Sequence, residues 1–306
     1  MSCVIHHRLT VCAIAITLML PLSSAAAESD NETAAELAPI IVRAGRLIQL
    51  QDQPTAPISV LDRNEIELRQ ARGLDDLLSE LPGVAVSGGP RRDGLMPVIR
   101  GLSDGRVVVR LDGARQNFQR NHRSQTYLDP SLLQQVEVLR GPASTLFGSG
   151  AIGGVVDFRT VDVPDFLGPE ADFGGRLSLG YQSKADEGSG ALTLAGRHGD
   201  FGLLGSLSRS RSEDFVDGDG NAEPFSGSDS LSGVLKANWQ LSDYGLLTAS
   251  YLDFEDSSNT HSTSDRAFDP NRLPPRSVDR RSRQKTASLR YTYRPAPGGL
   301  LDLDAT

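Results

Sequence analysis

Residues Leu231–Gln240 read LSGVLKANWQ, in which apolar or small residues alternate with polar ones. Successive side chains of a strand point to opposite faces, so this stretch presents one face to an oily phase and the other to water. The same alternation recurs in the segments 173–181, 191–197, 201–210, 245–254 and 286–294, and a last strand begins near Leu300. Strands of about ten residues fit a tilted crossing of a bilayer. The pattern predicts about seven antiparallel strands of a transmembrane β-barrel over residues 172–306.

The connections between these strands alternate in length. Those at 198–200, 241–244 and 294–299 are short, whereas 211–228 and 255–283 are long, polar and charged. A transmembrane barrel has this asymmetry, with tight periplasmic turns and extended outside loops, whereas a soluble sandwich has no reason for it. The two long segments are therefore predicted to be loops outside the cell.

The N-terminus predicts export from the cytoplasm. Arg8 precedes the apolar run Val11–Leu22, which is too short for a transmembrane helix of about 20 residues, and small residues follow it. Residues 1–27 are predicted to be a cleaved signal peptide, with an uncleaved anchor as the alternative. The only cysteines, Cys3 and Cys12, lie in this segment, so the exported chain is expected to have neither a disulfide nor a thiolate metal site.

Composition argues against two classes of function. The chain has 31 basic and 39 acidic residues and a net charge of −8, and removal of the signal peptide makes the charge one unit more negative. An acidic protein of this kind is not expected to bind nucleic acid. No set of nucleophile, base and acid stands out, so the chain is not predicted to be an enzyme.

Residues 28–53 are predicted to be a polar periplasmic tail with one apolar island, APIIVRAGR, at Ala38–Arg46. A short β-branched segment in a flexible leader can add as a strand to the sheet edge of another protein. The alternative is that this island is the first strand of the domain that follows.

Residues 54–163 are predicted to form a compact α+β domain. A strand at Ile58–Leu61 precedes a helix that Asp62 caps, with Glu65 completing a capping box, and a second helix at Leu74–Leu81 stops at a Pro-Gly pair. Further strands are expected at 84–86, 98–100, 106–111, 136–140 and 153–160, the third of them ending in an Asp112-Gly113 turn.

The stretch GSGAIGG, Gly148–Gly154, begins like a dinucleotide-binding turn. Such a turn requires a strand before it and a helix after it. Here the predicted order is inverted, because PASTLF favours a helix before the glycines and VVDFRT a strand after them. A nucleotide site is therefore not expected.

Four motifs resemble the TonB-dependent outer-membrane receptors: LDDLLSELPGVAV, VIRGL, LDGARQ and VEVLRGPASTLFGSGAIGGVVDFRT, together with the tail segment APIIVRAGR. The resemblance implies that residues 54–163 are a plug domain inside a large barrel. It also implies a TonB box that a TonB-type energy-transducing protein of the inner membrane grips, formed by Pro39, Ile40, Ile41 and Val42. The plug glycines Gly148, Gly150, Gly153 and Gly154 would then relieve crowding where backbone segments pass closely.

A barrel of about 22 strands has a lumen wide enough to need a plug, and about seven strands cannot close around one. An open sheet edge in hydrocarbon leaves backbone groups unsatisfied. The chain is therefore expected to be the front portion of a longer receptor or a truncated gene product, and to be unable to transport as it stands.

The segment DGARQNFQRNHRSQTYLDP, residues 112–130, is most similar to the receptors for haem and haemoproteins within this family. The similarity implies that haem is a transported ligand rather than a permanent cofactor, and that His122 is a candidate ligand of its iron. Tyr127 is a reserve ligand or a stacking face, and an ordinary polar role for His122 is the alternative. The candidate partners of haem propionates, or equally of ferric-siderophore carboxylates, are Arg115, Arg120 and Arg123.

A ferric-siderophore receptor is thus the alternative within the family, and an exported plug-like binding or signalling module is the alternative of another class. In DGDGNAEPF, Asp217, Asp219 and Asn221 alternate as in a calcium loop, but Ala222 and Ser228 stand where a glycine and a glutamate are required, so calcium is not expected. The basic run RSVDRRSRQK, at 276–285, could meet lipopolysaccharide phosphates, with a solvated loop as the alternative.

Overall fold

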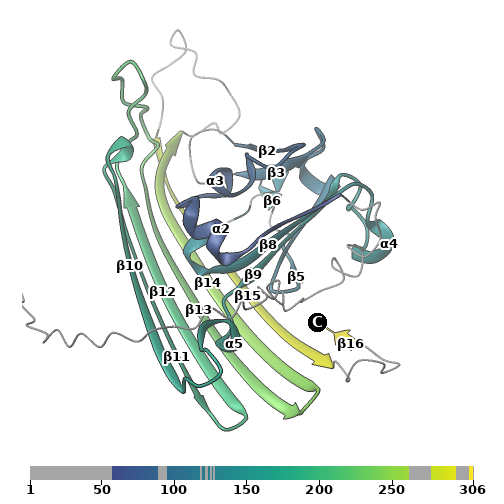
Figure 1. Cartoon of the computed structure of the whole chain (residues 1–306). Helices are drawn as coiled ribbons and strands as arrows, with labels where there is room; N and C mark the ends of the chain where they lie inside the picture. Colours follow the sequence, from purple (N-terminus) through teal and green to yellow (C-terminus); the bar gives the residue numbers. More distant parts are fainter. Residues whose placement is uncertain are drawn as a thin grey trace, which may run out of the picture. The chain divides into compact units, whose positions relative to one another are not determined.

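The computed structural model describes residues 57–88, 95–117, 119–120, 123–124, 126, 128–261, 277–293 and 303–305. The chain divides into two units, Met1–Val42 and Arg43–Thr306, and all of the described residues belong to the second. Among them, a small α+β domain is followed by a seven-stranded antiparallel sheet (Figure 1). The predicted fold class is confirmed.

The α+β domain opens with β1 (Ile58–Leu61), α2 (Arg63–Leu68) and α3 (Leu74–Leu78). The predicted capping box is present: the Asp62 carboxylate accepts a hydrogen bond from the Glu65 amide, and the Glu65 side chain accepts one from the Asp62 amide. α3 is shorter than predicted, because Leu81 precedes a proline and a residue in that position avoids helical backbone.

The domain is built on a five-stranded sheet in the order β1-β8-β9-β4-β5. Its further strands are β4 (Val107–Leu111), β5 (Ala114–Arg115), β8 (Leu133–Arg140) and β9 (Gly154–Thr160). β4 and β9 are parallel, and the other neighbours are antiparallel. Ile66, Leu77 and Leu78 from the helices join Val136 and Phe158 from the sheet in one buried cluster, which is the core of the domain.

Smaller elements complete this domain. β2 (Val84–Ser87) pairs with β3 (Met96–Ile99), and β6 (Gln119–Arg120) pairs with β7 (Arg123–Ser124). α4 (Ser144–Phe147) precedes the glycines and β9 follows them, so the helix-glycine-strand order is as predicted. The sequence did not indicate α5 (Val163–Phe166) or the 3-10 turns η1 (Asp104–Arg106), η2 (Pro130–Leu132) and η3 (Ser183–Ala185).

The seven-stranded sheet, here called the wall, has its strands in sequence order. They are β10 (Phe173–Gln182), β11 (Glu187–His198), β12 (Phe201–Ser212), β13 (Ser228–Ser242), β14 (Gly245–His261), β15 (Ser277–Tyr293) and β16 (Leu303–Ala305). The predicted alternation is present on β13, where Leu231 and Leu235 are about half exposed while Val234, Lys236 and Asn238 are buried. The middle of the wall therefore has an apolar outer face and an inner face with polar side chains.

The predicted loop over 255–283 is wrong at both ends, because β14 continues to His261 and β15 begins at Ser277. The residues of these strand ends are mostly polar or charged at successive positions, so they show no alternation in hydropathy. Arg283 on β15 forms an ion pair with Asp253 on β14, and such pairs across two strands stabilise a ladder that neither segment reveals alone.

Two of the three predicted short turns are present, with Gly199 and Asp200 between β11 and β12, and Asp243 and Tyr244 between β13 and β14. The third, at 294–299, lies outside the described residues. The longer connection from β12 to β13 covers 213–227, close to the prediction. Within the part of the chain that the structure describes, no helix has the length and apolar character needed to cross a membrane.

Candidate functional site

Several predicted site residues lie outside the described residues: Pro39, Ile40, Ile41, Val42, His122 and Tyr127. Arg120 and Arg123 lie on β6 and β7, where the strand register places them directly opposite each other. Arg115 lies on β5, at the beginning of the segment 113–128 that carries the other candidates. The described residues therefore define the base of this segment and the way it is held.

A buried lysine of the wall holds one end of the segment. The Lys236 ammonium, on the inner face of β13, lies 3.2 Å from Asp112 Oδ1 and 2.9 Å from Asp162 Oδ1. It also donates a hydrogen bond to the Thr160 carbonyl oxygen at 2.9 Å. The Lys236 side chain is only 1% exposed and that of Asp112 only 3%. We call this arrangement the Lys236 anchor, since it ties the α+β domain to the wall.

Asp112 is an ionised acceptor in this anchor. It follows β4 directly and has a φ of +48°, at the start of the predicted Asp-Gly turn. Burial alone would raise its pKa, but the Lys236 charge and hydrogen bonds from the Thr160 hydroxyl and amide lower that pKa below its ordinary value. Ser250 of β14 donates a further hydrogen bond at 3.0 Å. A carboxylate with this many donors stabilises one fixed position of the turn.

Two more contacts hold the same segment to the wall. Gln116 accepts a hydrogen bond from Gln284 of β15 at 2.7 Å, and Asp129 accepts one from Ser208 of β12. By the strand register, the wall residues that contact Gln116 and Asp129 lie nearer to the long connections than the wall residues that contact Asp112 do. The segment between Asp112 and Asp129 is therefore held at both ends, on the side of the wall that carries the long connections.

The glycine turn lies against β5 and the η1 turn. A Cβ on Gly150, whose φ is +94°, would lie 2.5 Å from the Gly105 carbonyl oxygen and 3.0 Å from the Arg115 guanidinium. A Cβ on Gly154, at φ +153°, would overlap the Leu139 carbonyl oxygen. Gly153 is similarly crowded, whereas a Cβ on Gly148 would meet only ordinary contacts, and the requirement there is its φ of +81°. These glycines leave room for neighbouring backbone and for Arg115.

A pair of carboxyl groups lies on the opposite face of the sheet from the helices. Glu137 on β8 and Asp157 on β9 are register partners, and Gln135 donates a hydrogen bond to Glu137 at 3.0 Å. Burial and the neighbouring Asp157 charge raise the pKa of Glu137 to about 8, although Arg159 and Arg110 oppose that rise. Glu137 is therefore mostly protonated at neutral pH.

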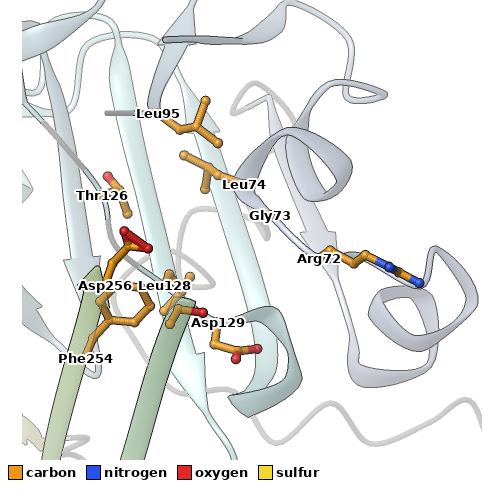
Figure 2. A pocket seen from close by; sticks show the side chains of 10 residues that line it. Arg72, Gly73, Leu74, Leu95, Thr126, Leu128, Asp129, Phe254 and Asp256 are labelled. Carbon is orange, nitrogen blue, oxygen red and sulfur yellow. The ribbon is translucent and has the colours of Figure 1, made fainter. Parts of the chain in front are cut away.

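The small cavity in Figure 2 lies where the segment meets the wall. It has a volume of about 30 Å³, and its lining includes Leu128 and Asp129 from the domain and Phe254 and Asp256 from β14. This volume holds one or two water molecules and excludes haem or a siderophore. Among the described residues, more open cavities of about 410 and 730 Å³ lie against β10–β12 and at the long-connection ends of β12–β15.

The calcium-like loop is closed by its own backbone. Asp217 accepts hydrogen bonds from the amides of Asp219 and Asn221 at 3.0 and 2.8 Å. The amides of Asn221 and Asp219, with the Asn221 side chain, lower the pKa of Asp217, so the carboxylate is stabilised without a metal. No group of three His, Cys, Asp or Glu side chains suited to a metal ion occurs in the described ranges.

Sequence reasoning missed the Lys236 anchor. The alternation placed Lys236 on the polar face of its strand, and LDGARQ placed Asp112 in a turn. A lysine among serines and small residues on an inner strand face was the available signal, because a buried charge requires a partner. The partner is 124 residues away in the chain, and only the fold brings the two together.

Residues 50–155 match the family model described as the TonB-dependent Receptor Plug Domain. The chain is 33% identical over 254 residues to TonB-dependent heme receptor A of Haemophilus influenzae, covering 82% of this chain and 33% of that protein. It is 29% identical over 312 residues to the Hemin receptor of Yersinia pestis, covering 95% of this chain and 43% of the relative. The chain thus spans less than half the length of these curated relatives.

Solved structures show the same fold. The FrpB iron transporter from Neisseria meningitidis superposes with a TM-score of 0.72 at 23% identity, covering 81% of this chain and 39% of that one. The hemophore receptor HasR of Serratia marcescens, solved as a double mutant with its hemophore HasA and heme, gives a TM-score of 0.70 at 26% identity. The superposition covers 84% of this chain and 38% of that one.

A plug-type domain tied to the inner face of an alternating antiparallel wall defines a class of outer-membrane receptors. The matches identify the chain as a plug domain with barrel strands of the TonB-dependent receptor family. The relatives named here are receptors and transporters, not enzymes.

Proposed function

We propose that the chain belongs to a receptor that takes up haem, or haem from haemoproteins, across the outer membrane. The observation that carries this proposal is the similarity to proteins named as haem receptors, which extends over 82% and 95% of this chain. Residues 54–163 are the plug and 172–306 are barrel strands, preceded by a signal peptide at 1–27 and a periplasmic tail at 28–53.

The cargo contacts in this proposal lie on the segment that the wall holds at both ends. His122 ligates the haem iron through a neutral imidazole, and Tyr127 is the reserve ligand or a stacking face. Arg115, Arg120 and Arg123 pair with the propionates. The register pairing of Arg120 with Arg123 supports this role, since it brings two cations of the segment to adjacent positions.

A haemin titration of the protein purified from outer membranes tests the proposal. We expect a shift of the haem Soret absorbance, and binding weaker by about tenfold or more in His122→Ala, because loss of a metal-site residue costs at least that much affinity. His198→Ala, at the end of β11, is the matched control and should bind as the parent does. No shift with the parent protein would favour a ferric-siderophore cargo, and unchanged binding by His122→Ala would remove that residue from the site.

Energy reaches the receptor through the tail in this proposal. Pro39, Ile40, Ile41 and Val42 form the TonB box and add as a strand to a TonB-type protein of the inner membrane. Ile41→Pro removes a backbone donor of that strand, so we expect it to abolish capture of the partner's periplasmic domain while haemin binding persists. Capture of the partner by Ile41→Pro at the parent level would exclude strand pairing at this segment.

A further inference from the structure

The outer face of the wall changes character toward the long connections. On this side of the wall, charged residues occupy outward positions of four strands, in the rows that also contain Leu207 and Leu231. The cations are Arg209 and Arg211 on β12 and Arg281, Arg283 and Lys285 on β15, and we call these five residues the cationic shelf. The acids between them are Asp229 on β13 and Asp253 and Glu255 on β14, and Glu213, which follows β12, pairs with Arg211 at 3.8 Å.

The strand register aligns the shelf in rows. In one row, Arg209 of β12, Glu255 of β14 and Arg283 of β15 are aligned, with Leu231 of β13 between the first two. In the next row toward the long connections, Arg211 of β12 is aligned with Arg281 of β15. Two residues along a strand advance about 7 Å, so the shelf is a band roughly 14 Å high on one face of the sheet. A band of this height is too short for the hydrocarbon core, which is about 30 Å thick, and it lies beyond the apolar part of the same face.

The cationic side chains of the shelf are more exposed to solvent than the acidic side chains that they pair with. The Arg281 and Arg283 side chains are 71% and 51% exposed, whereas those of Glu255 and Asp253 are 24% and 26% exposed. Arg281 donates through Nε to Glu255 at 2.7 Å, and Arg283 donates through Nε to Asp253 at 2.8 Å. A guanidinium has five N–H donors in a planar fork, so each arginine keeps donors for a second anion.

Among the residues that the structure describes, the other end of the same face has no such cations. Its outward residues are aromatic or apolar: Phe201, Trp239, Leu241, Tyr291 and Tyr293. Tyr293 also packs edge to face with Tyr244 of the adjoining turn, at 6.5 Å between ring centroids. Aromatic residues suit a membrane interface of either leaflet, whereas a band of exposed arginine and lysine side chains attracts anionic headgroups.

We propose that the cationic shelf binds the phosphate groups of phosphorylated glycolipids in the outer leaflet. This inference rests on the proposed function, because it places the wall in an outer membrane with the long connections outside. Arginine forks bind phosphate in a bidentate manner, and the apolar residues beside them contact the acyl chains of the same lipid. The acids beneath hold the guanidinium groups in place.

The test measures lipid binding by the protein purified from outer membranes in mild detergent. The probes are bis-phosphorylated lipid A and the same glycolipid without its phosphates, followed by native mass spectrometry. We expect the parent to prefer the phosphorylated lipid, and the variant R281Q/R283Q/K285Q to lose that preference by about tenfold or more, since each cation near an anionic lipid surface contributes about 1 kcal/mol. The matched control, R176Q/R197Q, removes wall arginines outside the shelf and should keep the preference.

Equal binding of the two lipids by the parent, or an unchanged preference in the triple variant, would overturn the proposal. Haemin absorbance of the same preparations separates this result from the proposed function: a haemin shift without lipid preference refutes only the shelf, and lipid preference without a haemin shift refutes only the cargo. Absence of the protein from outer membranes would contradict the placement that both proposals require.

Discussion

Replacing Lys236 by methionine should loosen the plug from the wall. The ammonium is buried and lies near two carboxylates, so its removal leaves Asp112 and Asp162 with less compensation. Breaking a buried ion pair from one side costs roughly 3–5 kcal/mol. Asp112 keeps hydrogen bonds from Thr160 and Ser250, so we expect the lower end, about 3 kcal/mol.

Hydrogen exchange of the folded protein in detergent measures this effect. A loss of about 3 kcal/mol shortens the protection of amides near the anchor by roughly a hundredfold, because about 1.4 kcal/mol corresponds to a factor of ten. Lys285→Met is the matched control, since that lysine lies on the outer face and is half exposed near Asp253. An exposed pair contributes at most about 1 kcal/mol, so protection should change little.

A second variant separates the charge effect from a general disturbance. Adding Asp162→Asn to Lys236→Met removes one of the two carboxylates that lost the lysine charge, and it should restore part of the lost protection, because substitutions at contacting residues do not have additive effects. Protection in Lys236→Met equal to that of the parent would refute the anchor. A loss that Asp162→Asn deepens instead of relieving would refute its electrostatic origin.

Two further predictions concern the plug itself. Gly154→Ala should destabilise the protein by about 1–3 kcal/mol in denaturant unfolding, because a Cβ there overlaps the Leu139 carbonyl oxygen at a positive φ, whereas Gly168→Ala, with open space around it, should be close to neutral. The raised pKa of Glu137 means that the folded protein holds this proton more tightly than the unfolded chain does. Its contribution to stability is therefore complete below pH 4.5 and is lost as the pH rises to about 8. Glu137→Gln should reduce the decline in unfolding free energy over that pH range. An unchanged pH profile in this variant would show that Glu137 is not the source of the decline.

Local patterns predicted the parts of the fold that depend on neighbouring residues. Alternation located the central parts of β10–β15, and the Asp62 capping box located α2. The ends of β14 and β15 were missed because their order depends on pairs such as Asp253 with Arg283, which lie 30 residues apart. Hydropathy alone cannot distinguish such a charged ladder from a solvated loop.

The candidate site was predictable only in part. The sequence placed Arg115 next to the Asp112 turn, and the resemblance to the receptor family implied crowding at the glycines. It could not show that the Arg115 guanidinium lies against Gly150, or that Gln116 meets Gln284, because both contacts join separate elements. The roles of His122 and Tyr127 in haem binding stay predictions.

The central claim is that the wall has one face for lipid and one for a plugged, watery lumen. Spin labels at single cysteines on β13 test it most directly, because Cys3 and Cys12 are the only cysteines in the chain and both precede the predicted cleavage site. In outer membranes, labels at Leu235 and Ala237, which lie on the apolar side of the cationic shelf, should collide with lipid-soluble oxygen, whereas a label at Ser232 should not. Equal exposure of both sets to a water-soluble relaxant would contradict the account.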